Sequence, residues 1–241
     1  MRKFLIPTAV GALALFAVEV APTIAQDPGP GTTVTADTKV SPNKAGTKKK
    51  PQGVKLTFNA TFTTPGDVEH PIIQSGDAYI PKGGLYNGGK YPKCSQSTLS
   101  HGGPSKCPPK SVMGKGTGDA WADTVHTKPD ITVINGGSNK IWFWTVLKNP
   151  ARVAAAVPAT ITKASGKWSY KVHFDVPQSL QIVAGIPITL NTLKVELGGK
   201  SWAKDWLATT SCPSSKKWPY SFTANLSTGG SVKYDGTTPC K

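Results

Sequence analysis

Arginine is nearly absent from this sequence of 241 residues, because Arg2 and Arg152 are the only two among 28 basic residues. The other basic residues are lysines, and with 13 acidic residues the formal net charge is +15. Arginine is the side chain that reads phosphate and guanine with two parallel hydrogen bonds. A basic surface built from lysine therefore argues against specific nucleic-acid recognition. It favours loose attraction to an anionic polymer or a lipid surface of the cell envelope.

Sequence signatures of catalysis are also missing. The chain has no Gly-x-Ser-x-Gly elbow, no His-Glu-x-x-His pair and no glycine loop that would cradle a phosphate ahead of a helix. We therefore expect a non-catalytic protein without a cofactor. The alternative is a secreted carbohydrate-active hydrolase, because the two carboxylates of such an enzyme are often remote from each other in sequence.

A long hydrophobic run occurs once, at the N-terminus. Arg2 and Lys3 precede an apolar stretch over residues 4–18, which is shorter than the roughly 20 residues that a membrane-spanning helix needs. A basic start, a short apolar run and a following segment of small residues are typical of a secretory signal peptide. We expect residues 1–25 to be removed, so that the mature chain begins at Gln26 and is not transmembrane.

The rest of the chain predicts one exported domain. Residues 26–33 are rich in proline and glycine and are expected to form a flexible leader, and residues 34–241 are expected to form a single domain. The sequence carries neither a cysteine for lipid attachment after the signal segment nor a hydrophobic C-terminal tail. We expect an extracellular, secreted protein that is either free or held at the cell surface without a covalent anchor.

Cysteine is scarce but even in number. Cys94, Cys107, Cys212 and Cys240 form two pairs that are local in sequence, and an oxidising compartment favours bridges over free thiols. Of the three possible pairings, Cys94 with Cys107 and Cys212 with Cys240 close the shortest loops. Zinc is the rival interpretation, but these spacings do not match those of a zinc finger.

Regular helix signals are weak, whereas short β-prone runs punctuated by glycine and proline fill the chain. Residues 54–62 read VKLTFNATF and alternate apolar with polar side chains, as a half-buried strand does. Further strands are predicted over residues 34–40, 72–80, 112–125, 130–135, 140–147, 152–162, 167–176, 187–197, 201–210, 217–226 and 231–234. This pattern predicts a mainly β fold, an antiparallel β-sandwich of immunoglobulin-like or jelly-roll-like type, with one short helix after Cys94 near the first disulfide.

One predicted strand is apolar on both faces. In residues 141–147 the side chains of Trp142, Trp144 and Val146 point to one face, and the apolar residues between them point to the other. A sandwich strand ordinarily buries one face only. Either another segment covers this outer face, which is the commoner arrangement, or Trp142 and Trp144 bind an apolar or sugar ligand. A small-ligand carrier with one of these tryptophans lining a cavity is a related hypothesis.

Lysines gather in one segment. Lys44, Lys48, Lys49 and Lys50 lie among proline and glycine residues without an acidic neighbour, which predicts an exposed loop. Such a loop is most often a solvated surface that protects a sheet edge. The functional alternative is a contact for anionic envelope polymers, with binding that weakens steeply as salt rises.

Acidic and histidine side chains are densest in residues 119–130. Asp123, His126 and Asp130 are weak candidates for a metal site, which would require a loop to bring them together, and their spacing is wider than that of Ca²⁺ loops. We therefore predict no metal site. Asp119 lies on the same side of a strand as Asp123, about 13 Å away.

The chain resembles a group of exported bacterial proteins of unassigned function. The resemblance rests on the segment SPNKAGTKKKP at residues 41–51, on the flanks of the first cysteine pair at residues 91–95 and 105–108, and on the closing Trp-Pro-Tyr of residues 218–220. It implies a single exported β domain with two bridges and assigns no site residues. The leading hypothesis is thus a non-catalytic, secreted or envelope-associated protein.

Overall fold

Strands make up most of the described chain. The computed structural model describes residues 31–66 and 70–241, so the predicted signal peptide and most of the predicted leader lie outside it. The strands are β1 (Thr33–Ser41), β2 (Gln52–Gly53), β3 (Lys55–Thr63), β4 (Ile73–Pro81), β5 (Gly84–Tyr86), β6 (Val112–Ala122), β7 (Val125–Thr127), β8 (Asp130–Gly137), β9 (Lys140–Leu147), β10 (Val153–Lys163), β11 (Trp168–Asp175), β12 (Ile182–Val183), β13 (Ile186–Gly198), β14 (Leu207–Thr209), β15 (Lys217–Leu226) and β16 (Ser231–Pro239). The mainly β fold predicted from the sequence is confirmed.

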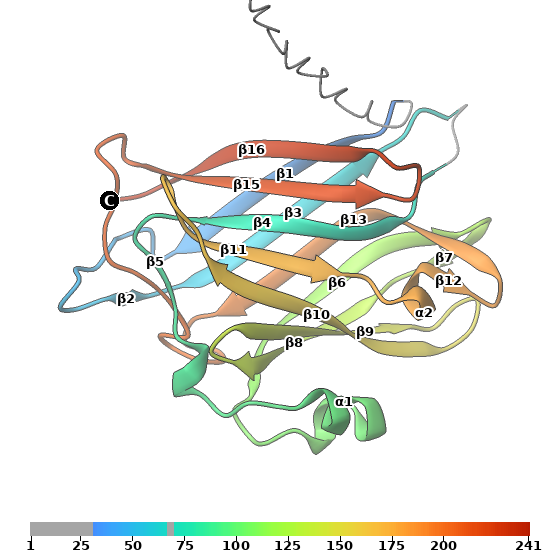
Figure 1. The fold of residues 1–241 in the computed structure, drawn as a ribbon, viewed down its shortest axis with the longest axis horizontal. Coiled ribbons are helices and arrows are strands. Elements are labelled where there is room, and N and C mark those ends of the chain that lie inside the picture. Colours follow the sequence, from blue (N-terminus) through green and yellow to red (C-terminus); the bar gives the residue numbers. More distant parts are fainter. Residues whose placement is uncertain (1–30, 67–69) are drawn as a thin grey trace, which may run out of the picture.

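One antiparallel sheet contains most of these strands. Its order is β1-β3-β13-β6-β8-β9-β10-β11-β4-β15-β16, with β7 beside β6 and β12 beside β13. The first and last strands come back together, and the Tyr220 hydroxyl on β15 donates a 2.8 Å hydrogen bond to the carbonyl oxygen of Ala36 on β1. The sheet is therefore nearly closed, with β1, β3, β13 and β6 behind β16, β15, β4 and β11 (Figure 1). This arrangement gives two facing layers, as in the predicted sandwich.

Alternation of side chains builds the core between these layers. On β3, Phe58 and Ala60 belong to the cluster of core residues that also holds Phe222 of β15. The rings of Phe58 and Phe222 lie 5.2 Å apart, centroid to centroid, across the interior. The apolar positions of the VKLTFNATF pattern thus face inward, as predicted, because period-two alternation places them on one side of the strand.

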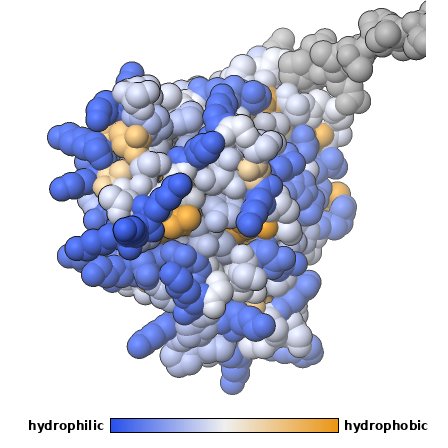
Figure 2. Space-filling view, turned by 60° about the vertical axis from the view of Figure 1, so that its left-hand side comes forward, coloured by the Kyte–Doolittle hydropathy of each residue, from blue (hydrophilic) through white to orange (hydrophobic). Residues whose placement is uncertain are grey.

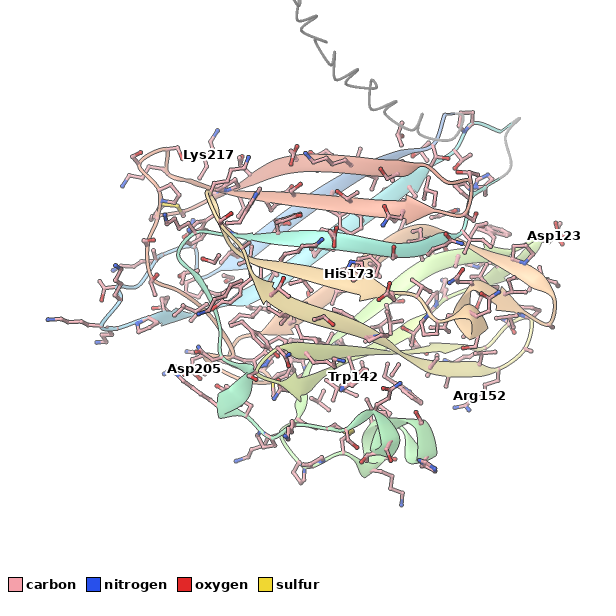
Figure 3. All side chains as sticks on the ribbon, in the orientation of Figure 1. Asp123, Trp142, Arg152, His173, Asp205 and Lys217 are labelled. Carbon is pink, nitrogen blue, oxygen red and sulfur yellow. A yellow bond between two sulfur atoms is a disulfide. The ribbon has the colours of Figure 1, made fainter. Side chains whose placement is uncertain are left out.

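The strands run between two ends of the molecule, which we name by their contents. Chain direction and strand pairing place the following loops at the disulfide end: residues 42–54, 164–167, 199–206 and 210–216. The opposite end, the α2 end, holds the connections at residues 122–130, 148–152 and 176–187. In Figure 3, Lys217 and Asp205 mark the disulfide end, and Asp123 and Arg152 mark the α2 end.

Both predicted disulfides are present. Cys94 and Cys107 are bridged with their Cα atoms 5.3 Å apart, and Cys212 and Cys240 with theirs 5.8 Å apart. The predicted helix after the first cysteine is confirmed as α1 (Gln96–Gly102). It begins there because the Ser95 hydroxyl caps it by accepting a 3.0 Å hydrogen bond from the backbone N–H of Thr98.

One predicted strand was wrong. The strand expected over residues 201–210 is mostly turns, and only β14 forms within it. The strands predicted over residues 217–226 and 231–234 form a hairpin as β15 and β16, in which Tyr220 faces Gly236. A second, one-turn helix, α2 (Gln178–Gln181), was not predicted. Within residues 31–66 and 70–241, no helix is long and apolar enough to cross a membrane.

Candidate functional site

An apolar cavity of about 290 Å³ lies inside the nearly closed sheet. Its wall includes the rings of Phe58, Phe143, Phe174 and Phe222, and aliphatic side chains from both facing layers, such as Val195. Among residues 31–66 and 70–241, no charged residue lines it, and hydroxyl groups reach the lining only at Thr145 and Tyr86. The cavity therefore suits a ligand, or part of a ligand, that makes van der Waals contacts and few hydrogen bonds.

One strand beside the cavity carries only glycine and alanine at its inward positions. Along β6 these positions alternate as Gly114, Gly116, Gly118, Ala120 and Ala122, and both alanines are fully buried. A methyl group built on Gly114, Gly116 or Gly118 would come within 2.8 Å of a backbone oxygen of β13, so the neighbouring strand already crowds the glycines. Ala120 is the position of this set that lines the cavity.

Hydrogen bonds close the cavity at the disulfide end. The small sheet β2-β14-β5 lies there, and Tyr86 of β5 lines the cavity. The Tyr86 hydroxyl lies 2.7 Å from the carbonyl oxygen of Gly137 and 3.1 Å from Oδ1 of Asn135. The same Oδ1 atom accepts a 3.1 Å hydrogen bond from the indole N–H of Trp206. Both Asn135 and Trp206 are fully buried, so this closure is a satisfied polar network under an apolar core.

Apolar contacts close the cavity at the α2 end. Leu180, the buried residue of the one-turn helix α2, lines the cavity together with Ile72 and Pro129 from the neighbouring loops. Between β12 and β13 the chain turns at two residues with left-handed backbone angles, Ala184 with φ +52° and Gly185 with φ +81°. This end therefore depends on one helical turn and a tight hairpin, without a buried polar network of the kind that holds Tyr86.

The two candidate binding tryptophans face away from the cavity. Trp142 is 4% exposed because the segment bridged by Cys94 and Cys107 covers it, and Leu99 of α1 packs in the same cluster. The indole N–H of Trp142 donates a 3.0 Å hydrogen bond to the carbonyl oxygen of Cys94. Trp144 is half-buried and packs on the same segment. Neither lines this cavity, and the covering segment explains why the strand is apolar on both faces. A ligand-binding role of these two tryptophans stays a prediction.

The lysine loop is exposed but anchored. Lys44, Lys48, Lys49 and Lys50 are all exposed, as predicted from their sequence. The backbone N–H of Ala45 donates a 2.8 Å hydrogen bond to the carbonyl oxygen of Lys241. The loop therefore lies against the end of the chain, at the disulfide end of the molecule.

Topology adds further lysines to that end. Connections far apart in sequence meet there and carry the exposed residues Lys82, Lys163, Lys167, Lys200, Lys204, Lys216, Lys217 and Lys241. In the same connections, within the described residues, Asp205 is the acidic side chain. Figure 2 turns this side forward and shows hydrophilic side chains over most of it, with small separate hydrophobic patches. The disulfide end is thus strongly basic.

The weak metal candidates do not converge. His126 stacks on Trp121, with ring centroids 4.9 Å apart, and contacts the carboxylate of Asp119. Asp130 instead pairs with Lys148 at 2.7 Å, and Asp123 is exposed at the tip of the β6–β7 hairpin. Over residues 31–66 and 70–241, no three histidine, cysteine or acidic side chains are grouped so as to hold a metal ion.

A second histidine cluster, which sequence reasoning did not single out, lies on the outer face of β11 and β4. His173 Nδ1 is 2.8 Å from Asp77 Oδ1, and His173 Nε2 is 3.2 Å from Asp175 Oδ1. Lys171 contacts the other oxygen of Asp77 at 3.0 Å, and this hydrogen bond raises the pKa of the lysine. The pairing of β11 with β4 places His173 opposite Asp77, a register that the separate strand sequences do not reveal. A mutually paired cluster on a sheet surface is a structural ion-pair network.

Comparison with known proteins finds no family model that matches the chain and no curated protein that matches it. Function therefore has to be inferred from the geometry alone. The residues that line the cavity were largely missed by the sequence analysis. No local pattern marks them as a set, because they come from strands that are far apart in the sequence.

Proposed function

We propose that this protein is exported and holds an apolar small molecule inside its sheet without transforming it chemically. The cavity is the observation that carries the proposal. An engineered cavity of about 150 Å³ binds benzene, and the present one, of about 290 Å³, is nearly twice that size. The lining residues that the structure describes include no acidic side chain, which favours holding a ligand over glycoside hydrolysis by a carboxylate pair. Two disulfides suit the oxidising environment outside the cytoplasm.

Energetics favour an occupied cavity. An empty apolar space of 290 Å³ costs on the order of 7 kcal/mol, taking about 24 cal/mol per Å³. The whole free energy of unfolding of an ordinary domain is about 5–15 kcal/mol. A ligand that fills the space regains the missing contacts of the wall, so binding and stability are coupled.

An apolar fluorescent probe tests this proposal. N-phenyl-1-naphthylamine should gain fluorescence on titration with the protein and be displaced by medium-length alkanes. The variant Val195→Phe places a ring into the cavity, because Val195 is a buried lining residue, and should weaken probe binding at least about tenfold. The matched control is Thr192→Phe, which adds the same ring on the exposed side of β13 and should bind normally. Equal binding by both variants, or no binding by the wild type, contradicts the proposal.

A second role follows from the lysines at the disulfide end. We propose that it attaches the protein to anionic envelope polymers, and the gathering of lysines from separate connections is the supporting observation. Retention on an anionic polymer column should fall steeply with salt. Replacing Lys44, Lys48, Lys49 and Lys50 by glutamine should weaken retention more than replacing Lys106, Lys115, Lys128 and Lys194, which removes the same charge elsewhere. Retention that does not change with salt concentration, or an equal loss of retention in the two variants, rules this role out.

A further inference from the structure

Exposed large hydrophobic side chains are concentrated at the α2 end. Among the described residues, the exposed large hydrophobic side chains are Trp121 (37%), Val125 (39%) and Ile182 (39%). Trp121 and Val125 belong to the β6–β7 hairpin, and Ile182 belongs to the β12–β13 hairpin. Single exposed hydrophobic residues are ordinary, but three of them on two adjoining hairpins form a group.

Strand register shows that two of these side chains lie on one continuous strip. Trp121 on β6 pairs with Thr189 on β13, and Ile182 on β12 pairs with Pro187 on β13. Directly paired residues point to the same side of a sheet, and so do residues two apart along a strand. Trp121, Pro187 and Ile182 therefore share the outer face across three adjacent strands. We call these three residues the outer strip, and all three are exposed.

The same hairpins close the cavity on their inner side. Ile188, next to Pro187 on β13, is buried and lines the cavity, and Val183, next to Ile182, is 1% exposed in the cluster that holds Leu180. Pro187 and Ile182 of the outer strip thus lie on the face of β12 and β13 opposite to the cavity. These strands adjoin α2, the one-turn closure of the cavity (Figure 1).

We propose that the outer strip docks the α2 end onto a lipid surface, and that the apolar ligand passes between the lipid and the cavity at this end. The inference rests on the proposed function. A ligand that suits a cavity without charges partitions into lipid rather than water, so its source is a lipid phase. The α2 end is the route we infer, because the one-turn helix that carries Leu180 and the β12–β13 hairpin close the cavity there.

The size and chemistry of the strip favour lipid over a protein partner. A specific protein interface buries about 800 Å² on each side, whereas three side chains that are partly exposed offer on the order of a few hundred Å². Tryptophan with neighbouring aliphatic residues is the composition that settles at a membrane–water boundary. A small apolar strip is therefore sufficient for lipid contact and too small for a stable dimer.

Charges of both signs are mixed at this end, which distinguishes it from the strongly basic disulfide end. Among the described residues of the connections around the strip, Asp123 and Asp130 are exposed, and so are Lys128, Lys148 and Arg152. Docking through the outer strip should therefore occur on zwitterionic lipid and depend little on salt. Attachment through the disulfide end should instead require anionic lipid and weaken with salt.

Vesicle flotation tests this inference. Wild-type protein should float with phosphatidylcholine vesicles at both low and high salt. The double variant Trp121→Ser/Ile182→Ser should partition at least about fivefold less, because two apolar side chains no longer enter the lipid. The control Trp168→Ser changes a half-exposed tryptophan at the disulfide end and should leave partition unchanged. The single variants Trp121→Ser and Ile182→Ser, each expected to partition less than the wild type, keep the test decisive if the double variant does not fold.

Two further measurements separate this inference from the proposed function. Binding of N-phenyl-1-naphthylamine without vesicles should be equal in the wild type and the double variant, whereas its transfer from vesicles to the double variant should be slower. Failure of the probe to bind wild-type protein overturns the proposed function itself. Normal probe binding with no flotation, with flotation that needs anionic lipid, or with flotation unchanged in the double variant overturns only the docking. A dimer that the double variant abolishes overturns it as well.

Discussion

Leu180 of α2 and Tyr86 of β5 line opposite ends of one apolar cavity. Tyr86 is held by hydrogen bonds within a buried polar network, while Leu180 is held by apolar contacts of a helix of a single turn. Local opening starts where few contacts have to be broken together. The cavity is therefore expected to open at Leu180 and to remain closed at Tyr86 during ligand exchange.

Removing the Tyr86 hydroxyl should destabilise the fold. In Tyr86→Phe the carbonyl oxygen of Gly137 and the Oδ1 atom of Asn135 lose a donor inside the protein, so the free energy of unfolding should fall by about 1–3 kcal/mol. Urea unfolding measures this change. Tyr234→Phe, at a half-buried tyrosine of β16, is the control and should cost less. Equal, small losses in both variants would show that the network contributes little.

Alkaline pH should weaken the fold through the same side chain. Burial raises the pKa of the Tyr86 hydroxyl above its ordinary value of 10.0, so the folded protein keeps a proton that the unfolded chain releases. The resulting stability is complete below pH 10 and is lost as the pH rises further. Burial also raises the pKa of Tyr220. Between pH 9 and pH 11, wild-type protein should lose more unfolding free energy than Tyr86→Phe, and parallel losses would refute this assignment.

The Cys212–Cys240 bridge should contribute strongly to stability. It joins residues 28 apart in sequence and holds the chain end beside the lysine loop. Replacing both cysteines by serine should lower the free energy of unfolding by about 3 kcal/mol, because the unfolded chain gains freedom. Thermal unfolding of the variant, compared with the Cys94→Ser/Cys107→Ser variant, measures this. A melting temperature equal to that of the wild type would be inconsistent with such a contribution.

Filling the cavity should stabilise the empty protein. Val195→Phe should raise the free energy of unfolding by about 0.5–2 kcal/mol, as cavity-filling substitutions commonly do. An apolar ligand should raise the melting temperature of the wild type but hardly that of this variant. Val195→Ala enlarges the cavity and serves as the opposite control, with a loss of stability. A destabilised Val195→Phe protein would mean that the space around Val195 is already filled.

Local sequence pattern predicted the strands well where period-two alternation was clear. The alternation around Phe58 became β3, and the short helix expected after Cys94 became α1, which ends before Gly103 with its left-handed backbone angle. The strand predicted over residues 201–210 was wrong because a spacing of four, as between Trp202 and Trp206, does not distinguish a strand from other local structures. The chain turns there, and the indole N–H of Trp206 donates a hydrogen bond to Asn135. Such long-range polar contacts leave no periodic signal in the sequence.

Closure of the sheet and the cavity were beyond local reasoning. Whether β16 returns to β1 depends on the twist accumulated over all the strands between them. The covering of Trp142 depends on where the Cys94–Cys107 segment folds back, although the doubly apolar strand did indicate that some cover was needed. Small residues on β6 were visible in the sequence, but their meaning required knowing that this strand faces the interior.

The most direct measurement is an isotope-filtered NMR experiment on labelled protein with unlabelled dodecane. With the ligand inside the sheet, we expect nuclear Overhauser contacts from its methylene groups to the methyl groups of Val195, Leu193 and Leu180, which line the cavity. Contacts that are confined to exposed residues such as Ile182, or no contacts at saturating dodecane, would contradict an apolar ligand inside the sheet.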